Sequence, residues 1–459
     1  MVFSSITFLF FFLPLVMLLY FITPSKYRNL ILLVCSLVFY GWGEPENLIV
    51  MIISIFIGYV TGLLIEKNRN TYKSKLYCYT SVIIQMLFFT YYKYSDFIIE
   101  NINSITGIKI PLLKIVLPIG ISFYTFQLIS YTVDIYRGEK AQRSFINMAA
   151  YISMFPQLVA GPIVRYQDIK GELENRSCSI NNISCGIRRF SAGLCKKVLL
   201  ANQLANLVDI FKASDEKSAL FYWMYMISFS MYIYYDFSGY SDMAIGLGKI
   251  LGFNFNENFN YPYISKSITE FWRRWHISLG TWFRDYVYIP LGGNRVSPFR
   301  HYINILLVWM LTGFWHGAQW NFCLWGIYFA IILIIEKRFL IKKLEKHRIF
   351  SHIYTLFFVG ISFLIFNGNN MAEIISDIRG IFAAGVPFVS KESLYYFKSY
   401  MPFLTAAVIG TTPVVKNIYL KIPDKIKNII EPVIISAGFI LSTAFLVDGS
   451  FNPFLYFRF

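Results

Sequence analysis

The sequence predicts an all-α membrane protein, a polytopic bundle of spanning helices with additional re-entrant and interfacial segments. Composition is the first observation: of 459 residues, 56% are hydrophobic, 19% aromatic and only 15% charged, whereas soluble domains are roughly a quarter charged. Apolar runs long enough to form membrane helices recur along the chain. Basic residues gather in the loops between these runs, which is typical of the cytoplasmic loops of membrane proteins.

The net charge does not indicate a nucleic-acid-binding protein. The chain has 42 Lys and Arg against 26 Asp and Glu, a formal charge of +16, but the basic residues separate apolar runs instead of covering one solvated face. Disorder is excluded because 45 Phe and 33 Tyr require burial. The six cysteines show no metal-ligand spacing, so we expect reduced thiols in the core and no metal site.

Five apolar runs in the first third of the chain predict spans that alternate in direction. They cover residues 2–22, 29–42, 48–65, 76–92 and 115–135. Basic loops follow the first, third and fifth runs, beginning at Lys26, Lys67 and Arg137, and an acidic turn at Glu44 follows the second. With the basic loops in the cytoplasm, the chain starts outside and crosses five times without a conflict.

Further apolar runs predict additional membrane segments, some of them too short to cross. They cover residues 199–210, 220–235, 303–315, 320–335, 354–366, 402–415 and 433–447. The run 148–162 leads into FPQLVAGPIVRY, whose prolines and glycine favour a re-entrant turn over a straight span. The segment 374–384 is polar enough to lie at the interface. We expect about ten to thirteen membrane segments in a single domain that spans residues 1–459.

Two of the five histidines stand inside apolar, aromatic sequence. His276 lies in EFWRRWHISLGTWFR, and His316 lies in LTGFWHGAQW. An ionisable group at membrane depth is costly to hold, so it is by default a candidate functional residue. The alternative is a hydrogen-bonded core histidine, which is the commoner role for a single histidine on an apolar helix.

Basic loops on both sides of His316 predict a helical hairpin with His316 and Gly317 at its tip. The first arm, residues 303–315, would be about 20 Å long at ~1.5 Å per residue, short of a hydrocarbon core of about 30 Å. The tip is therefore expected to lie deep. A buried imidazole reached from the cytoplasm suits a general base that deprotonates a hydroxyl acceptor, and it also suits the proton relay of a pump.

The stretch around His276 is amphipathic. Tryptophans and arginines alternate in it: Trp272, Arg273, Arg274, Trp275, Trp282 and Arg284. One interpretation is an interfacial helix anchored by tryptophans. The other is that Arg273, Arg274 and Arg284 bind the phosphates of a cytoplasmic donor, because guanidinium groups pair with phosphate in a bidentate manner. His276 would then assist at the reacting centre.

Two acidic residues, Asp236 and Asp242, stand in YYDFSGYSDMAIGLG. Helix caps or polar contacts that organise helix packing are the favoured interpretations for both. The chain has no nucleophile elbow, phosphate-binding Walker loop or HExxH zinc motif.

A series of ordered blocks resembles the bacterial membrane-bound O-acyltransferases, specifically the alginate O-acetylase subfamily. The resemblance runs nearly end to end, through MVFSSITFLFFFLP, YRNLILLVCSLVFYGW, LPIGISFYTFQLISYTVDIYRGE, MFPQLVAGPIVRY, YYDFSGYSDMAIGLGKILGFNFNENFNYPY, FWRRWH, GFWHGAQW and FNPFLYFRF. A single WHG would be weak support, whereas so many blocks in order are specific.

The resemblance implies a helical bundle of that family's fold with a catalytic histidine in a tunnel. His316 matches this histidine, and His276 matches the family's second active-site histidine. Gln157, Arg165, Asp236 and Trp315 become structural or tunnel-lining candidates. The implied donor is a cytoplasmic acyl thioester, in this subfamily acetyl-CoA, with no permanently bound cofactor.

The resemblance also implies partners and a location. The acyl group would pass across the bacterial cytoplasmic membrane to an extracytoplasmic, alginate-like polysaccharide, and a separate acetyltransferase partner would complete the transfer. The remaining alternatives are D-alanyl transfer to teichoic acid, a transporter or flippase, and a structural subunit of a polysaccharide export complex. A transporter would show two related halves, and the sequence contains no such repeat.

Overall fold

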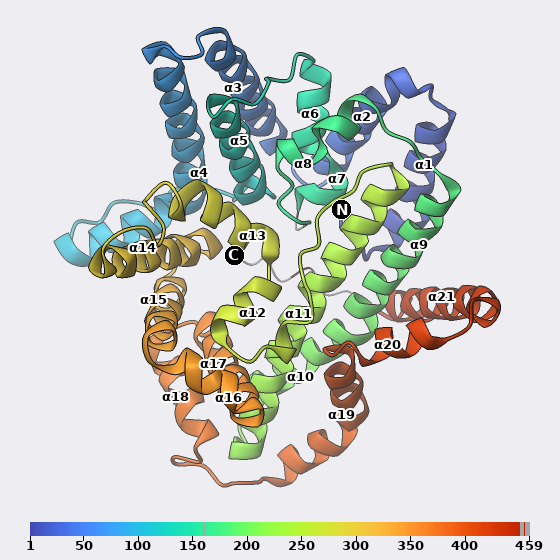
Figure 1. Cartoon of the computed structure of the whole chain (residues 1–459). Coiled ribbons are helices and arrows are strands. Elements are labelled where there is room, and N and C mark those ends of the chain that lie inside the picture. The colour runs from blue at the N-terminus through green and yellow to red at the C-terminus, as the bar shows by residue number, and fades with distance from the viewer. Residues whose placement is uncertain (160, 450–453, 455–459) are drawn as a thin grey trace. The chain divides into compact units, whose positions relative to one another are not determined.

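A computed structural model describes residues 1–159, 161–449 and 454, and within them the regular structure is helical throughout (Figure 1). The helices form two compact units. The first comprises Met1–Phe190 and Ser241–Asn256, and the second comprises Ser191–Tyr240 and Glu257–Phe459. The predicted all-α class is confirmed, while the single domain over 1–459 stays a prediction. Except for Phe454, the closing block FNPFLYFRF lies outside the described residues.

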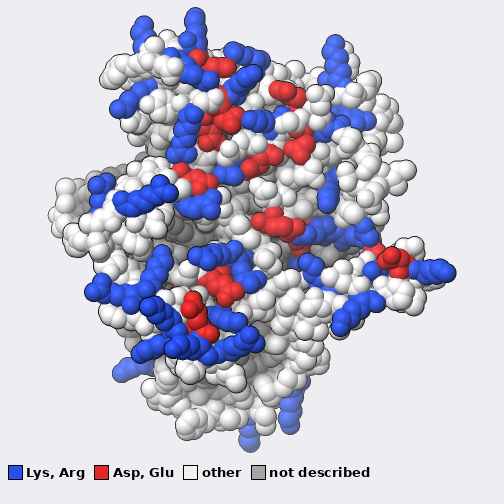
Figure 2. Space-filling view, viewed as in Figure 1, with Lys and Arg blue, Asp and Glu red and all other residues white. Residues whose placement is uncertain are grey.

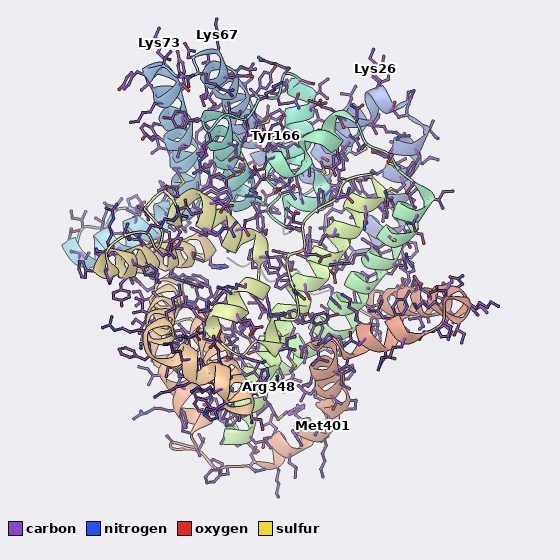
Figure 3. All side chains as sticks on the ribbon, in the orientation of Figure 1. Lys26, Lys67, Lys73, Tyr166, Arg348 and Met401 are labelled. Atoms are coloured by element: carbon purple, nitrogen blue, oxygen red, sulfur yellow. The ribbon has the colours of Figure 1, made fainter. Side chains whose placement is uncertain are left out.

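The first unit contains the helices that the early apolar runs predict. Its complete α-helices are α1 (Leu13–Ile22), α2 (Arg28–Gly41), α3 (Asn47–Lys67), α4 (Tyr72–Thr106), α5 (Ile121–Tyr136), α6 (Phe145–Ser153), α7 (Phe155–Leu158) and α8 (Tyr166–Glu174). A π-helix, Phe8–Phe12, continues directly into α1, and a 3-10 turn, Ser25–Tyr27, precedes α2. The helix α9 (Ile180–Cys195) begins in it. Lys26, Lys67 and Lys73 all lie at the same end of this unit (Figure 3), as expected for loops on one side of a membrane.

Glycines on α3 allow α5 to approach closely. A Cβ atom at Gly62 would lie 2.8 Å from the Tyr131 ring, and one at Gly58 would lie 2.7 Å from Leu128. The predicted run 115–135 is wrong at its start, because α5 begins only at Ile121. Gly120 precedes it with φ +76, and a Cβ there would lie 2.5 Å from the carbonyl oxygen of Leu158. Only glycine fits such a left-handed, crowded position.

The interruption predicted in the run 148–162 is present. α6 ends at Ser153, and α7 is a single buried turn from Phe155 to Leu158. Pro156 lies in the first turn of α7, where its missing N–H costs no helical hydrogen bond. Ala160 lies outside the described residues, and entry of this turn into a membrane stays a prediction.

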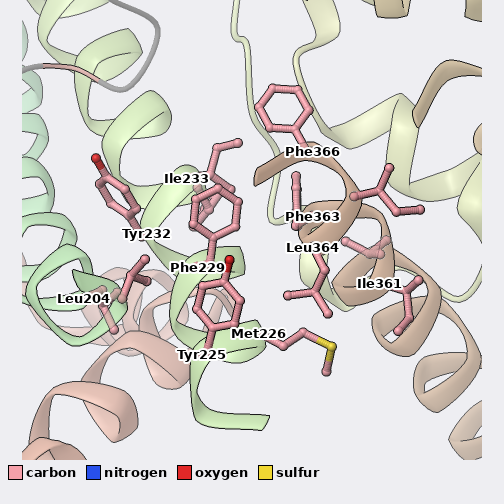
Figure 4. Packing of buried hydrophobic residues seen from close by; sticks show 14 of the residues in the cluster. Leu204, Tyr225, Met226, Phe229, Tyr232, Ile233, Ile361, Phe363, Leu364 and Phe366 are labelled. Carbon is pink, nitrogen blue, oxygen red and sulfur yellow. The ribbon is translucent and has the colours of Figure 1, made fainter. Parts of the chain in front are cut away.

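The second unit is an aromatic-rich bundle around the site. It contains α10 (Asn202–Ala213), α12 (Ile268–Arg274), α13 (Ile277–Phe283), α14 (Pro298–His316), α15 (Trp320–Ile335), α16 (Ile341–Lys346), α17 (Arg348–Asn367), α18 (Met371–Ile381), α19 (Lys391–Gly410), α20 (Val414–Lys421) and α21 (Asp424–Val447), and α11 (Ala219–Ile250) runs from it into the first unit. Figure 4 shows Leu204 of α10 and Tyr225 and Phe229 of α11 in one buried cluster with Phe363 and Leu364 of α17.

Three described helices, α3, α17 and α21, are long and apolar enough to cross a membrane. A fourth span is possible by length and composition if α19 and α20, which are bent by 68° at a short break, count as one. The predicted segment 402–415 is not one continuous helix, because α19 ends at Gly410 and α20 begins only after Pro413. The total of ten to thirteen membrane segments stays a prediction.

Basic side chains gather on the second unit in the region of α12, α16 and the start of α17 (Figure 2). Several basic residues follow α15 along the chain: Lys337, Arg338, Lys342, Lys343, Lys346 and Arg348. This is the basic loop that the sequence assigns to the cytoplasmic side of the His316 hairpin.

Candidate active site

His316 is the last residue of α14, and α15 begins at Trp320. The predicted hairpin with His316 at its tip is confirmed. Its two arms touch through glycines: a Cβ at Gly313 would lie 2.3 Å from the Phe322 oxygen, and one at Gly326 would lie 2.4 Å from the Trp309 oxygen. The backbones are therefore in direct contact.

The predicted length of the first arm is wrong. α14 begins at Pro298 and contains 19 residues, which corresponds to about 28 Å instead of about 20 Å. The apolar run missed the polar first turn, where Pro298 starts the helix with its fixed φ. Because the arm is nearly as long as the hydrocarbon core is thick, its length does not indicate that the tip lies deep in the membrane. The depth of His316 stays a prediction.

Aromatic rings enclose the His316 side chain, which is 4% exposed. The ring centroids of Trp315, Trp325 and Phe366 lie 5.0, 5.1 and 5.4 Å from that of the imidazole. The residues come from α14, α15 and α17, so three helices fix the position of the imidazole. Edge-to-face contacts of this kind are favourable for ring quadrupoles.

Trp315 lies between the two predicted histidines. Its ring centroid is 6.0 Å from that of His276 and 5.0 Å from that of His316. The structure therefore brings His276 and His316 to one indole. His276 also packs edge to face against Phe237 of α11, with the ring centroids 4.6 Å apart.

The backbone of His276 is strained. It connects α12 to α13 with φ +44 and ψ 53, a left-handed conformation that is uncommon for residues other than glycine and clusters at functional sites. The preceding loop holds this turn in place. The Ile277 N–H donates to the Asn258 carbonyl at 3.0 Å, and the Asn260 N–H donates to the Arg274 carbonyl at 2.9 Å.

The imidazole of His276 is 2% exposed and hydrogen-bonded at one nitrogen. Its Nδ1 lies 3.2 Å from Oδ1 of Asn258, which also accepts from the N–H and the hydroxyl of Ser278. Nε2 makes no hydrogen bond to any described residue. Burial lowers the pKa of His276 to about 3, so the ring is neutral at physiological pH.

A cavity of about 510 Å³ adjoins His276, a volume within the usual range for small-molecule sites. Its walls come from α12, α13, α14 and α15 and from two short π-helices, Arg284–Tyr288 and Glu336–Leu340. The lining residues are Thr269, Trp272, Arg273, His276, Ile277, Leu279, Gly280, Thr281, Phe283, Arg284, Tyr288, Ile305, Val308, Trp309, Thr312, Leu333 and Lys337. Thr312 lies one turn before His316 on α14.

Three cations line this cavity: Arg273, Arg284 and Lys337. Burial, and then the neighbouring charge of Arg273, lower the pKa of Lys337. A bound anion would reduce the repulsion between these positive charges. Arg284 also bonds Asp285 at 2.7 Å. Arg274, predicted to bind the donor with the others, does not line the cavity and instead pairs with Glu270 at 2.9 Å.

The two acidic residues of α11 both form ion pairs. Asp236 pairs with Lys197 at 2.5 Å, with side chains 0% and 3% exposed, and the next residue, Phe237, contacts His276. Asp242 pairs with Arg189 at 2.6 Å in the first unit. Both side chains therefore have polar partners, as the favoured sequence interpretation expects, and a tunnel-lining role for Asp236 stays a prediction.

Gln157 and Arg165 belong to the first unit. Gln157 is buried and donates its Nε2 to the Tyr151 carbonyl, and Arg165 pairs with Asp168 at 3.1 Å at the start of α8. Both have local structural partners, and a role in lining a tunnel stays a prediction.

Sequence reasoning missed several residues that build the site. Asn258 and Lys337 were not singled out, nor was Glu336, a fully buried carboxylate that accepts the N–H groups of Ile268 and Thr269 at 2.7 and 2.9 Å. Glu336 thereby fixes the start of α12, where a negative charge is favourable. The adjacent Glu336 and Lys337 at the end of an apolar run were the available signal.

Comparison with known proteins assigns this architecture to a family. The model of the membrane-bound O-acyltransferase family matches residues 136–341, which include both histidines. A probable alginate O-acetylase of Azotobacter vinelandii is 42% identical over 81% of this chain and 76% of its own length. The peptidoglycan O-acetyltransferase of Helicobacter pylori is 31% identical over 100% of this chain and 98% of its own length. The teichoic acid D-alanyltransferase of Bacillus subtilis is 31% identical over 54% of this chain and 68% of its own length.

The predicted family and enzyme class are therefore confirmed. The chain is a membrane protein with acyltransferase chemistry, and the helical hairpin of His316 and the cavity beside His276 both lie largely within the matched region. It belongs to the membrane-bound O-acyltransferase family.

Proposed function

We propose that this protein takes an acetyl group from acetyl-CoA at the cytoplasmic face and passes it across the membrane for O-acetylation of an extracytoplasmic polysaccharide. The cavity carries this proposal, because it combines a buried neutral histidine with three cations beside the helix that ends in His316. The two relatives named as acetylating enzymes act on alginate and on peptidoglycan, both of which are polysaccharides.

The lining of the cavity suits the chemistry of a coenzyme A thioester. Arg273, Arg284 and Lys337 offer positive charge to phosphates, and guanidinium groups bind phosphate oxygens in a bidentate manner. Ile305, Val308 and Leu333 line the cavity as apolar side chains and suit the uncharged pantetheine arm. No carboxylate is among the described residues that line it.

His316 is proposed to act on the acceptor. As a general base it removes the proton of a hydroxyl group while the hydroxyl oxygen attacks the thioester carbonyl. The C–S bond then breaks, and the thiolate of coenzyme A leaves and takes up the proton. If His316 instead receives the acetyl group first, an imidazole nitrogen bonds to the acyl carbon as the C–S bond breaks. This N–C bond breaks when the hydroxyl oxygen attacks, and the hydroxyl proton passes to the released imidazole.

The alternatives make different demands on the site. D-alanyl transfer would bring an amino-acyl group with a positive charge towards a cavity that already holds three cations, which disfavours it. A transporter would use the same polar groups without a covalent step. A separate extracytoplasmic acetyltransferase is proposed as the partner that completes the transfer.

The first test measures base-releasable acetate on the surface polysaccharide of cells with and without this chain. We expect acetate only when the chain is present, and labelled acetyl-CoA supplied to membrane vesicles should deliver its label to the polysaccharide fraction. Release of acetate without transfer of label would contradict acetyl-CoA as the donor. Release of D-alanine in place of acetate by base would favour the alternative reaction.

Replacing Arg273 with glutamine is expected to raise the KM for acetyl-CoA by roughly 10- to 100-fold, because a hydrogen bond to a charged group contributes about 1.5–3 kcal/mol. The change in kcat should be smaller, since the phosphates are remote from the reacting carbonyl. Steady-state kinetics in vesicles measure both constants.

Arg274→Gln is the matched comparison for Arg273→Gln. Arg274 pairs with Glu270 and does not line the cavity. The KM of the Arg274→Gln variant for acetyl-CoA should therefore stay near that of the unaltered protein. An equal rise in both variants would mean that the cavity does not define the donor site.

A further inference from the structure

The side chain of Asn258 is buried against the strained turn at His276. Its Oδ1 lies 3.2 Å from Nδ1 of His276 and accepts from both the N–H and the hydroxyl of Ser278, at 3.1 and 2.9 Å. A backbone N–H can only donate, so the Ser278 amide identifies the contacting atom of Asn258 as its carbonyl oxygen.

This contact determines which nitrogen of His276 carries the proton. An amide oxygen has lone pairs and no hydrogen, so the bond to Nδ1 requires a proton on Nδ1. In the neutral ring the other nitrogen, Nε2, then has a free lone pair. Nε2 is buried, makes no hydrogen bond to any described residue, and belongs to a residue that lines the cavity.

We infer that Asn258 is a positioning residue that holds His276 with its proton on Nδ1, so that Nε2 offers the donor cavity a hydrogen-bond acceptor. The acceptor would receive an N–H or O–H group of the bound thioester or of the attacking alcohol. This inference rests on the proposed function for the identity of the substrates, and on the hydrogen bonds alone for the state of the ring.

The charges around His276 favour the neutral ring. Three cations line the cavity beside His276: Arg273 of α12, Arg284 after α13 and Lys337 after α15. Tyr288 lines the same cavity. His316 lies beyond Trp315 on α14, and on α11 the carboxylate of Asp236 is already paired with Lys197. Positive neighbours raise the cost of a protonated imidazole.

The decisive variant is Asn258→Asp, which keeps the accepting oxygen and adds a negative charge beside Nδ1. A carboxylate favours the imidazolium and raises the pKa of His276 by about 1–3 units. Since activity requires the lone pair on Nε2, it falls as the pH drops through the raised value. We expect the acid limb of kcat/KM to move up by at least about one pH unit, with activity recovered at alkaline pH.

Two further variants separate positioning from folding. Asn258→Leu removes the acceptor and should lower kcat/KM by about 10- to 100-fold at every pH, the usual cost of leaving a buried donor without its partner. Asn256→Asp makes the same chemical change on an exposed side chain of the same segment and should keep the unaltered pH profile. If the Asn258→Asp profile coincides with that of the unaltered protein, or falls uniformly without a shift, the positioning role is overturned.

A second readout does not depend on turnover. Nitrogen-15 histidine spectra of the purified protein contain five histidines, and the signals of His276 are those lost in His276→Gln. A proton on Nδ1 is expected, and a proton on Nε2 overturns the inference even if the enzyme is active. A protein with the expected tautomer but no acetyl transfer would contradict the proposed function and leave the positioning role supported.

Discussion

His316→Ala is expected to lower kcat/KM for acetyl transfer by about 10²- to 10⁴-fold, the usual contribution of a positioned acid or base. The imidazole is packed against the aromatic rings of Trp315, Trp325 and Phe366. Alanine leaves these rings in place and removes the group that exchanges the proton. Base-releasable acetate and label transfer from acetyl-CoA measure the loss.

The control for His316→Ala is His347→Ala, because His347 is exposed and follows α16 in the basic loop. It should keep full transfer, and both variants should reach the membrane in equal amounts. Transfer that survives in His316→Ala at the level of this control would remove His316 from the chemistry.

The second large effect concerns stability. Breaking the buried pair of Lys197 and Asp236 by Lys197→Met or Asp236→Leu should cost about 3–5 kcal/mol in the free energy of unfolding, because each change removes the ion-pair partner of a buried charge. The two side chains are 3% and 0% exposed, so water does not replace the missing partner. Denaturant unfolding of the purified protein measures the cost.

The double variant Lys197→Met with Asp236→Leu is the matched test of this explanation. Replacing both charges with apolar groups of similar volume is often neutral or stabilising, so we expect it to recover most of the lost stability. A double variant as unstable as the sum of the single changes would show that the charges have further essential partners. Because Phe237 contacts His276, the single variants should also reduce acetyl transfer.

The sequence was sufficient for features that depend on local pattern. The all-α class follows from apolar runs, and the hairpin at His316 follows from basic loops on both of its sides. The boundaries were less accurate where a backbone requirement determined them. Gly120 sets the start of α5 through a close approach to Leu158, and no periodicity of apolar residues carries that information.

The parts of the site that sequence reasoning missed depend on contacts between distant segments. In the sequence, nothing distinguishes Lys197 from the other basic residues, and only the fold places Asp236 of α11 beside it. Asn258 is likewise one of several asparagines in its segment, and only the fold brings its side chain to His276. The three arginines near His276 look equivalent in sequence, but α12 directs Arg273 to the cavity and Arg274 to Glu270. Such pairings are set by tertiary packing.

The glycine contacts of the hairpin also limit how it can move. With Gly313 against the Phe322 backbone and Gly326 against the Trp309 backbone, sliding either arm by a residue would push a Cβ atom into a carbonyl group. Close-packed backbones of this kind have one register. The two arms therefore travel together, and any gating of access to His316 must come from displacement of the surrounding helices while the hairpin itself stays rigid.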